Sequence, residues 1–306
     1  MGNFFIKRPE YFALVAAALN GTIGPLNRLG FSQGASHNQV AFYKCFLAFL
    51  VLLVFCLARR QHRETLFSLR AKWWHFLVLS FFGIFCLYFF ETWAFSQASI
   101  PLVSFLTYAA GGITIILSAI VLGEGIGIYK IVAFLLIMAG VGMLYSFGVR
   151  LSGSNSGIVL ALLGGLGYAL FIFASKYLKT GSGLPHLVWL FGFGSIYLAF
   201  PLATERLLIP NVISCAVIVS LVVFPTIGGF YFTTKAIHGG EASKVQILET
   251  SDPLFATLFA YLLFRENLSF LGMVGAASIM LGLVIAMKNE RIANIKEPLS
   301  IEVRNG

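Results

Sequence analysis

Two carboxylates lie inside an otherwise apolar stretch of the sequence. Glu249 and Asp252 belong to the segment ILETSDPLFATLFAYLLF (247–264), and Pro253 follows them directly. Residues three apart share one face of a helix, so both carboxylates point the same way. A charge in hydrocarbon costs about 2.5 kcal/mol or more, and a proline frees an earlier backbone carbonyl, so protein or water must cover this face. We expect this helix to line a polar cavity; in the simpler alternative, one carboxylate only satisfies the kink.

A lysine and a glutamate form a second candidate pair. Lys44 stands near the start of the apolar segment 39–57, and Glu91 stands near the end of the segment 75–96. With a rise of about 1.5 Å per residue, both lie about 8 Å below the same membrane surface. Because each charge alone would be costly there, we predict a Lys44–Glu91 ion pair that closes or lines an external vestibule. A plainer interpretation is an ion pair that only holds two helices together.

Small and polar residues interrupt the first apolar segment at mid-depth. Asn20 and Thr22 stand beside Gly21, and Gly24 and Pro25 follow shortly after. Broken helices in membrane proteins can present backbone dipoles and polar side chains to a substrate. Small residues also serve close helix packing, which is the alternative explanation. Asn20 and Thr22 are therefore the better candidate ligands, since glycine alone is uninformative.

The elements that position these residues are membrane-spanning helices. The chain has 306 residues, 58% of them hydrophobic and 11% charged, with mean hydropathy +0.89. An average soluble domain has about 25% charged residues, and apolar stretches of about 20 residues match helices that cross a bilayer. We predict an all-α, polytopic membrane protein with ten transmembrane helices. Their approximate ranges are 11–30, 39–57, 75–96, 100–122, 126–147, 157–178, 185–204, 212–236, 243–264 and 268–287.

The basic residues predict the orientation, because cytoplasmic loops retain Lys and Arg. With the N-terminus inside, sixteen of the 21 basic residues are cytoplasmic, four are external and Lys44 lies within a span. The external ones are Arg28, Arg150, Arg206 and Arg265. Trp73 and Trp74, beside Lys72, resemble an interfacial anchor. We expect a multi-pass protein of a bacterial inner (plasma) membrane, with both termini cytoplasmic and no cleaved signal peptide.

The chain also repeats itself. IVLGEGIGIYKIVAFLLIMAGVG (120–142) aligns without gaps with LLFRENLSFLGMVGAASIMLGLV (262–284). The alignment matches Glu124 with Glu266, Ile137 with Ile279, Met138 with Met280, and Gly140 with Gly282. Five helices per unit is an odd number, so the second unit enters the membrane inverted, which favours a binding site near the midplane and alternating access. We predict repeats at 1–148 and 157–288 and a cytoplasmic tail at 289–306.

These features together resemble the EamA-type ten-helix carriers of the drug/metabolite transporter superfamily. The resemblance covers about residues 11 to 287. The matching segments are GTIG (21–24), FYK (42–44), LGE (122–124) and DPLFATLFAYLLFRE (252–266). The chain departs from the family pattern in having Gly111-Gly112 where proline is frequent and Lys44 where arginine is more frequent. Lysine is a point charge and lacks the bidentate fork of arginine, so an anion-binding role for Lys44 does not follow from the family alone.

The resemblance implies a cavity surrounded by helices one, three, four, six, eight and nine, and hence aromatic walls from those helices. Ligand pockets generally combine apolar walls with a few polar groups. The expected substrate-binding residues are Asn20, Thr22, Lys44, Glu91, Trp93, Tyr108, Tyr168, Tyr231 and Glu249. The expected coupling or gating residues are Glu249, Asp252, Lys44 and Glu91. We expect Glu124 and Glu266 instead to cap the N-termini of the fifth and tenth helices, where a negative charge meets the helix dipole.

The most consistent function is secondary transport of a small organic metabolite, with an amino acid or similar zwitterion favoured by the mix of buried cation and carboxylates. A desolvated carboxylate favours its protonated form, so protons are a candidate coupling ion at Glu249 or Glu91. Facilitated diffusion and exchange remain open. The expected partners are the substrate and membrane lipids, without nucleic acid, in a monomer or homodimer.

Other function classes lack their motifs in this sequence. The alternatives are a membrane-embedded lipid-modifying enzyme and a non-transporting receptor. No HExxH, GxSxG or paired-cysteine constellation supports an enzyme or a metal site, and no GxxxxGK[ST] loop supports ATP-driven transport. The four cysteines lie within apolar runs without CxxC spacing, so we expect neither disulfides nor zinc. We therefore expect no enzymatic activity, no metal and no cofactor.

Overall fold

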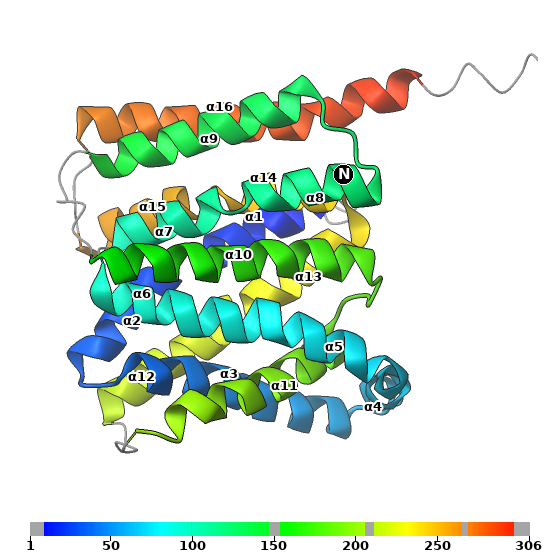
Figure 1. Ribbon diagram of the computed structural model, residues 1–306, viewed down its shortest axis with the longest axis vertical. Coiled ribbons are helices and arrows are strands. Elements are labelled where there is room, and N and C mark those ends of the chain that lie inside the picture. Colours follow the sequence, from blue (N-terminus) through cyan, green and yellow to red (C-terminus); the bar gives the residue numbers. More distant parts are fainter. Residues whose placement is uncertain (1–8, 99, 147–153, 206–210, 265–268, 297–306) are drawn as a thin grey trace, which may run out of the picture.

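The computed structural model describes residues 9–98, 100–146, 154–205, 211–264 and 269–296, and this part of the chain forms a bundle of helices without strands (Figure 1). The predicted all-α membrane class is confirmed. The first half contains α1 (Pro9–Asn20), α2 (Ile23–Ser32), α3 (His37–Ala58), α4 (Arg60–Ser68), η1 (Leu69–Lys72), α5 (Trp73–Ser80), η2 (Phe81–Glu91), α6 (Thr92–Gln97), α7 (Ile100–Ala109), α8 (Gly112–Leu122) and α9 (Ile128–Ser146). The second half contains α10 (Asn155–Tyr177), α11 (Leu184–Leu202), α12 (Val212–Leu221), η3 (Val222–Gly229), α13 (Phe230–Gly239), α14 (Ala242–Glu249), α15 (Asp252–Phe264) and α16 (Phe270–Lys296).

Seven helices of the described residues are long and apolar enough to cross a membrane, and Ile128–Met143 is a shorter apolar helix. The remaining two of the ten predicted spans are broken helices. Range 11–30 divides into α1 and α2 at Gly21 and Thr22, and range 243–264 divides into α14 and α15 at Thr250 and Ser251. The ten-span prediction is therefore consistent with the structure, in which two spans consist of shorter halves.

Polar side chains fix the starts of several helices. Ser36 caps α3, accepting a hydrogen bond from the backbone N–H of Gln39, whose side chain accepts one from Ser36 N–H. Ser154 and Asn211 cap α10 and α12 in a similar way. These bonds satisfy amide groups that the first turn of a helix leaves unpaired. At the end of α8, Gly123 adopts a left-handed conformation with φ 68°, which costs glycine little.

Helices α9 and α16 lie side by side along one edge of the bundle (Figure 1). A Cβ atom at Gly140 would lie 2.7 Å from Cγ1 of Ile279, and a Cβ atom at Gly282 would lie 2.7 Å from Cγ1 of Ile137. The sequence repeat aligns Gly140 with Gly282 and Ile137 with Ile279, so the two contacts lie at equivalent positions in the two halves. Small residues let membrane helices approach closely, and here each helix contributes one glycine to the contact.

Two π-helical segments interrupt the third and eighth predicted spans. They are η2 (Phe81–Glu91) and η3 (Val222–Gly229), and the repeat alignment places residues 80–87 opposite η3. π-helical turns are rare and frequently occur at functional sites. Both segments supply residues to the central cavity described below, so the irregular backbone lies where the molecule has internal space.

The two ends of the bundle differ. One end, which we call the α4 end, holds α4, the start of α1 and the start of α14 (Figure 1). The opposite end holds the α2–α3 connection and the C-terminus of α11, where Glu205 accepts hydrogen bonds from Ser36 and Asn38. The sequence predicts that the α4 end is cytoplasmic.

Candidate substrate cavity

Two adjoining cavities lie between the halves of the chain, and both are lined by Asn20, Ile23, Glu91 and Tyr108. The first has a cavity volume of about 20 Å³ and the second about 10 Å³, so both are narrow in this conformation. The first is also lined by Lys44, Leu87, Tyr88, Thr107, Tyr168, Pro225, Thr226 and Phe230. The second is also lined by Gly21, Gly24, Pro25, Phe95, Ile100, Ser104, Asp252 and Ala256. Aromatic and apolar walls with a few charged groups are the usual composition of a ligand pocket.

Lys44 and Glu91 both line the first cavity but do not form the predicted direct ion pair. The Lys44 ammonium donates to Oγ1 of Thr92 at 3.3 Å and lies 4.0 Å from the centroid of the Tyr88 ring. Glu91 is buried, and its Oε2 has no hydrogen-bond partner among the described residues. The sequence predicted that both charges lie at one depth. The Lys44 ammonium nevertheless contacts the face of the Tyr88 ring and not the Glu91 carboxylate. Each charge thus retains bonding capacity within the cavity.

Asp252 lies at the start of α15, where the ninth span is broken. Its carboxylate accepts a hydrogen bond of 2.5 Å from the Tyr108 hydroxyl of α7. The break of the first span packs against this position, since a Cβ atom at Gly21 would lie 3.2 Å from the Asp252 carbonyl oxygen and 2.9 Å from the Ala256 nitrogen. The two broken helices therefore meet at the second cavity, which Asp252 and Tyr108 both line.

Glu249 lies one turn earlier, at the end of α14, and has no exposed surface. Tyr168 and Thr233 both donate hydrogen bonds to its carboxylate, the latter at 2.7 Å. Tyr168 lines the first cavity, whereas Glu249 is separated from it by the Tyr168 hydroxyl. The structure thus brings the two predicted acids of the ninth span to one region, with a tyrosine on each.

The two polar candidates of the first span differ in their surroundings. Asn20 lines both cavities, and its Oδ1 lies against Gly229 at the end of η3. The Thr22 hydroxyl instead donates to the Leu19 carbonyl oxygen at 2.7 Å. Thr22 therefore satisfies a carbonyl at the helix break and does not line either cavity.

Two predicted aromatic walls lie outside the lining of both cavities. Trp93 stacks on His37, with ring centroids 5.1 Å apart and planes 4° apart. The Tyr231 ring centroid lies 4.6 Å from the Lys235 ammonium. The span and depth of these residues could be estimated from sequence, but the rotation of each helix about its axis could not. Tyr108 and Tyr168, by contrast, do line the first cavity.

The sequence prediction missed several lining residues. Tyr88 contacts Lys44, and Thr107 and Thr226 add hydroxyls to the wall of the first cavity. Thr226 follows Pro225 within an apolar run, which was a local signal of an irregular helix. Thr107 carried no such signal, because a single threonine in a span usually bonds its own backbone.

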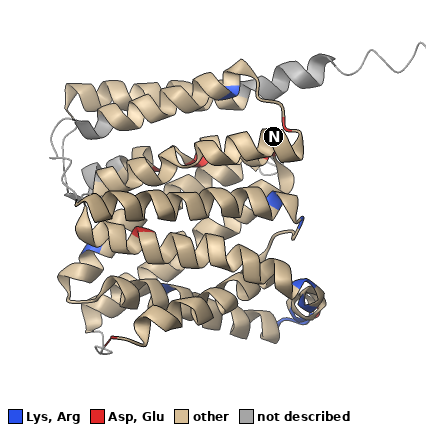
Figure 2. Ribbon diagram, in the orientation of Figure 1, with Lys and Arg blue, Asp and Glu red and all other residues tan. Residues whose placement is uncertain are grey.

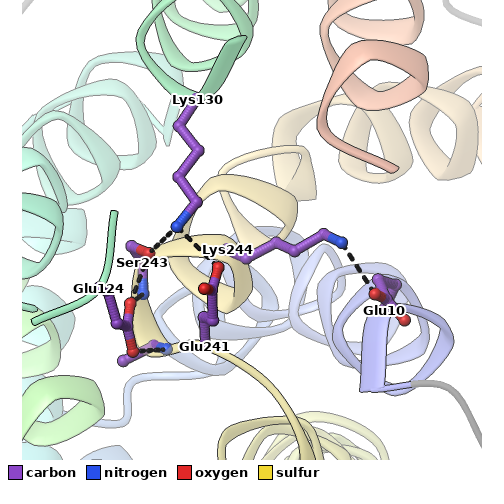
Figure 3. Close-up of polar contacts among 7 residues, drawn as sticks. Glu10, Glu124, Lys130, Glu241, Ser243 and Lys244 are labelled. Carbon is purple, nitrogen blue, oxygen red and sulfur yellow. Dashed lines mark hydrogen bonds and ion pairs between the residues drawn. The ribbon is translucent and has the colours of Figure 1, made fainter. Parts of the chain in front are cut away.

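At the α4 end, a polar cluster joins the two halves of the chain (Figure 3). Glu124 Oε1 accepts a hydrogen bond from the N–H of Ala242 at 2.8 Å, and Oε2 accepts from N–H and Oγ of Ser243 at 3.0 and 2.5 Å. The prediction that Glu124 caps the fifth helix is wrong: it caps α14, the start of the ninth span. Its partners lie far along the chain, and local sequence cannot distinguish the two helix starts. Glu266 lies outside the described residues.

Two ion pairs complete this interhalf cluster, which consists of Glu10, Glu124, Lys130, Glu241, Ser243 and Lys244. Lys130 Nζ lies 2.6 Å from Glu241 Oε2 and 3.0 Å from Ser243 Oγ. Lys244 Nζ lies 2.8 Å from Glu10 Oε1, and both side chains are at least 93% buried. Every one of these contacts connects the first half of the chain to the second (Figure 3). The cluster therefore holds the halves together at one end, while the charged cavity lies between them deeper in the bundle.

Comparison with known proteins agrees with an integral membrane protein built from two halves. The model of the EamA-like transporter family matches residues 8–146 and again residues 155–288. The chain therefore belongs to the EamA-like transporter family. An uncharacterized transporter of Archaeoglobus fulgidus is 25% identical over 280 residues, which are 91% of this chain and 96% of that protein. A solved crystal structure, described only as that of a protein, superposes with a TM-score of 0.78 at 17% identity, covering 93% of this chain and 98% of the other, and shows the same fold.

Proposed function

We propose that this transporter moves a small zwitterionic metabolite, most simply an amino acid, across a bacterial inner membrane by alternating access. The observation that carries the proposal is that Lys44 and Glu91 line one cavity without neutralising each other directly. A substrate with a carboxylate and an ammonium group satisfies both charges at once. Asp252 in the adjoining cavity offers a second site for the ammonium group.

The interhalf cluster supports alternating access. The binding charges lie near the predicted external ends of their helices, whereas Lys130–Glu241 and Lys244–Glu10 join the halves at the predicted cytoplasmic end. Release to the cytoplasm requires these contacts to separate, and closure of the opposite end requires the halves to rock about the central site. Protons are the proposed coupling ion, bound and released at Glu249 or Glu91.

Binding selectivity tests the substrate class. Purified protein is screened by thermal shift against amino acids, against amines that lack the carboxylate and against carboxylic acids that lack the amine; hits are then measured by counterflow in proteoliposomes. We expect stabilisation by the zwitterions only. Lys44→Met and Glu91→Gln should each weaken binding by about tenfold or more, because each removes a charge-assisted hydrogen bond.

The control variant is Tyr197→Phe, whose hydroxyl bonds the Leu77 carbonyl at 3.4 Å outside both cavities. It should bind the same hits with unchanged affinity. If amines alone stabilise the protein, and Lys44→Met binds them with unchanged affinity, the substrate is a cation and the proposal of a zwitterionic substrate is wrong. Counterflow without any hit would contradict the substrate class as a whole.

A further inference from the structure

The segment between the second and third predicted spans carries a dense group of positive charges. Arg59, Arg60, Arg63, Arg70 and Lys72 are all exposed, and Glu64 is the single carboxylate among residues 59–72. Arg60 pairs with Glu64 at 2.9 Å, and Lys72 donates to the Lys179 carbonyl oxygen at 3.3 Å. Arg63 and Arg70 have no ion-pair partner among the described residues. The segment therefore presents a surplus of positive charge.

Apolar side chains fix this segment against the bundle. Leu66 and Leu69 are buried, and the Trp189 indole of α11 donates to the Leu66 carbonyl oxygen at 3.0 Å. Phe67, Trp73 and Trp74 instead remain exposed, at 55%, 50% and 58%. Large aromatic rings beside basic residues at the end of a span are typical of the boundary between hydrocarbon and headgroups.

The direction of α4 agrees with a position at this boundary. In Figure 1 the spans run across the page, whereas α4 is seen nearly end-on at the edge of the bundle, so its axis crosses theirs. Figure 2 shows Lys and Arg concentrated on this element. A helix that crosses the spans at their ends lies along the plane of the membrane, with basic side chains at headgroup level.

We propose that the surface formed by Arg59, Arg63, Arg70, Trp73 and Trp74 binds the headgroups of anionic phospholipids in the bilayer around the transporter. Charge complementarity selects this partner: clusters of Lys and Arg on interfacial helices attract anionic lipids, each basic residue contributing a factor of about five in affinity. The indoles enter the interface while the guanidinium groups contact phosphate oxygens, to which arginine can donate two parallel hydrogen bonds. The lipid holds α4 and the adjoining starts of the spans at a defined depth.

Tryptophan quenching tests this site directly. The full-length variant Trp93→Phe/Trp189→Phe keeps Trp73 and Trp74 as reporters and is reconstituted in phosphatidylcholine with a small fixed fraction of brominated phosphatidylglycerol or brominated phosphatidylcholine. We expect stronger quenching by the brominated phosphatidylglycerol. High salt should abolish the difference because it screens exposed charges. Equal quenching by both lipids would overturn the proposal.

Matched substitutions assign the effect to the surface. Arg63→Gln should reduce the lipid preference by about fivefold, and Arg59→Gln/Arg63→Gln/Arg70→Gln should abolish it. Arg28→Gln removes an exposed arginine at the opposite end of the bundle and should leave the preference unchanged. An equal loss in Arg28→Gln would attribute the preference to net charge and refute the site. Loss of the preference on adding inorganic phosphate, at an ionic strength where sodium chloride leaves it intact, would refute a lipid surface in favour of a site for free anions.

A second measurement does not depend on replacing the tryptophans. Native mass spectrometry of the unmodified protein counts retained phosphatidylglycerol and phosphatidylcholine molecules. Selective retention of phosphatidylglycerol, lost in the triple glutamine variant, agrees with the proposal. Selective retention that persists in that variant places the lipid elsewhere and overturns it.

Discussion

Lys130 Nζ and Glu241 Oε2 lie 2.6 Å apart and join the two halves of the chain at the α4 end. Both ends of this pair belong to segments that begin a span, α9 and α14. If the halves rock during transport, the pair must separate whenever the α4 end opens. We therefore expect Lys130→Met to shift the conformational equilibrium toward a state open at this end. A partly exposed ion pair contributes about 1 kcal/mol or less, which corresponds to a severalfold shift in population.

Cysteine labelling can measure this opening. Val245, one turn beyond the pair in α14, is 2% exposed, and Cys215 is the exposed native cysteine among the described residues. In Val245→Cys/Cys215→Ser, maleimide labelling should become severalfold faster when Lys130→Met is added. Lys130→Glu/Glu241→Lys should restore slow labelling. Unchanged labelling in Lys130→Met would show that the pair does not hold this end closed.

Replacing one partner of the pair Lys244–Glu10 should destabilise the protein far more than replacing one partner of the pair Arg60–Glu64. The side chains of the first pair are 7% and 6% exposed, whereas those of the second are 85% and 65% exposed. Removing one partner of a buried pair leaves an uncompensated charge and costs about 3 kcal/mol or more. Glu10→Gln should therefore lower the thermal unfolding temperature in detergent by several degrees, and Glu64→Gln should leave it nearly unchanged. Equal effects of the two substitutions would contradict this ranking.

The sequence predicted the spans well because apolar length and punctuation are local properties. The breaks beside Asn20 and before Asp252 were visible as Gly21, Thr22 and Pro253 in apolar runs. The π-helix η2 carried no such local signal in the sequence, whereas Pro225 in an apolar run was a local signal of the irregular helix η3. The two broken helices and the shorter apolar helix Ile128–Met143 together explain why seven long spans, and not ten, occur among the described residues.

The candidate site could be predicted only in part, because sequence gives the depth of a residue but not the direction in which it points. Lys44, Glu91 and Asp252 do line cavities, since a charge in a span must face the interior. An uncharged aromatic such as Trp93 has no such requirement and packs on His37. The partners of Glu124 could not be predicted either, because they lie in α14, far along the chain.

The contact between α9 and α16 predicts opposite results for two neighbouring glycines. A Cβ atom at Gly140 would lie 2.6 Å from the Gly275 carbonyl oxygen, whereas at Gly142 the nearest side-chain atom, Cε2 of Phe105, would be 3.8 Å away. Backbone cannot retreat cheaply, and overpacking costs about 1–3 kcal/mol. Gly140→Ala should lower the unfolding temperature, and Gly142→Ala should not. A stable Gly140→Ala variant would show that the two helices are not packed as described.

If Glu249 binds the coupling proton, two substitutions that alter the same hydrogen bond should have different effects on transport. Tyr168 and Thr233 donate to Glu249, so Tyr168→Phe removes a donor but keeps the carboxylate, whereas Glu249→Gln removes the proton-binding group. Flux is measured in proteoliposomes loaded with a hit from the thermal-shift screen, with and without a pH gradient. In Glu249→Gln the gradient should no longer change the flux. Exchange of substrate without a gradient should continue in that variant.

Tyr168→Phe provides the matched control, because it should slow flux while leaving the pH-gradient dependence in place. A purely structural Glu249 would instead lower flux in both variants without changing that dependence. If Glu249→Gln retains full gradient-driven flux, the coupling proton must bind elsewhere. Glu91 and Asp252 are then the carboxylates to replace next, since both line the second cavity. Glu91→Gln would be measured first, because Glu91 Oε2 has no hydrogen-bond partner among the described residues.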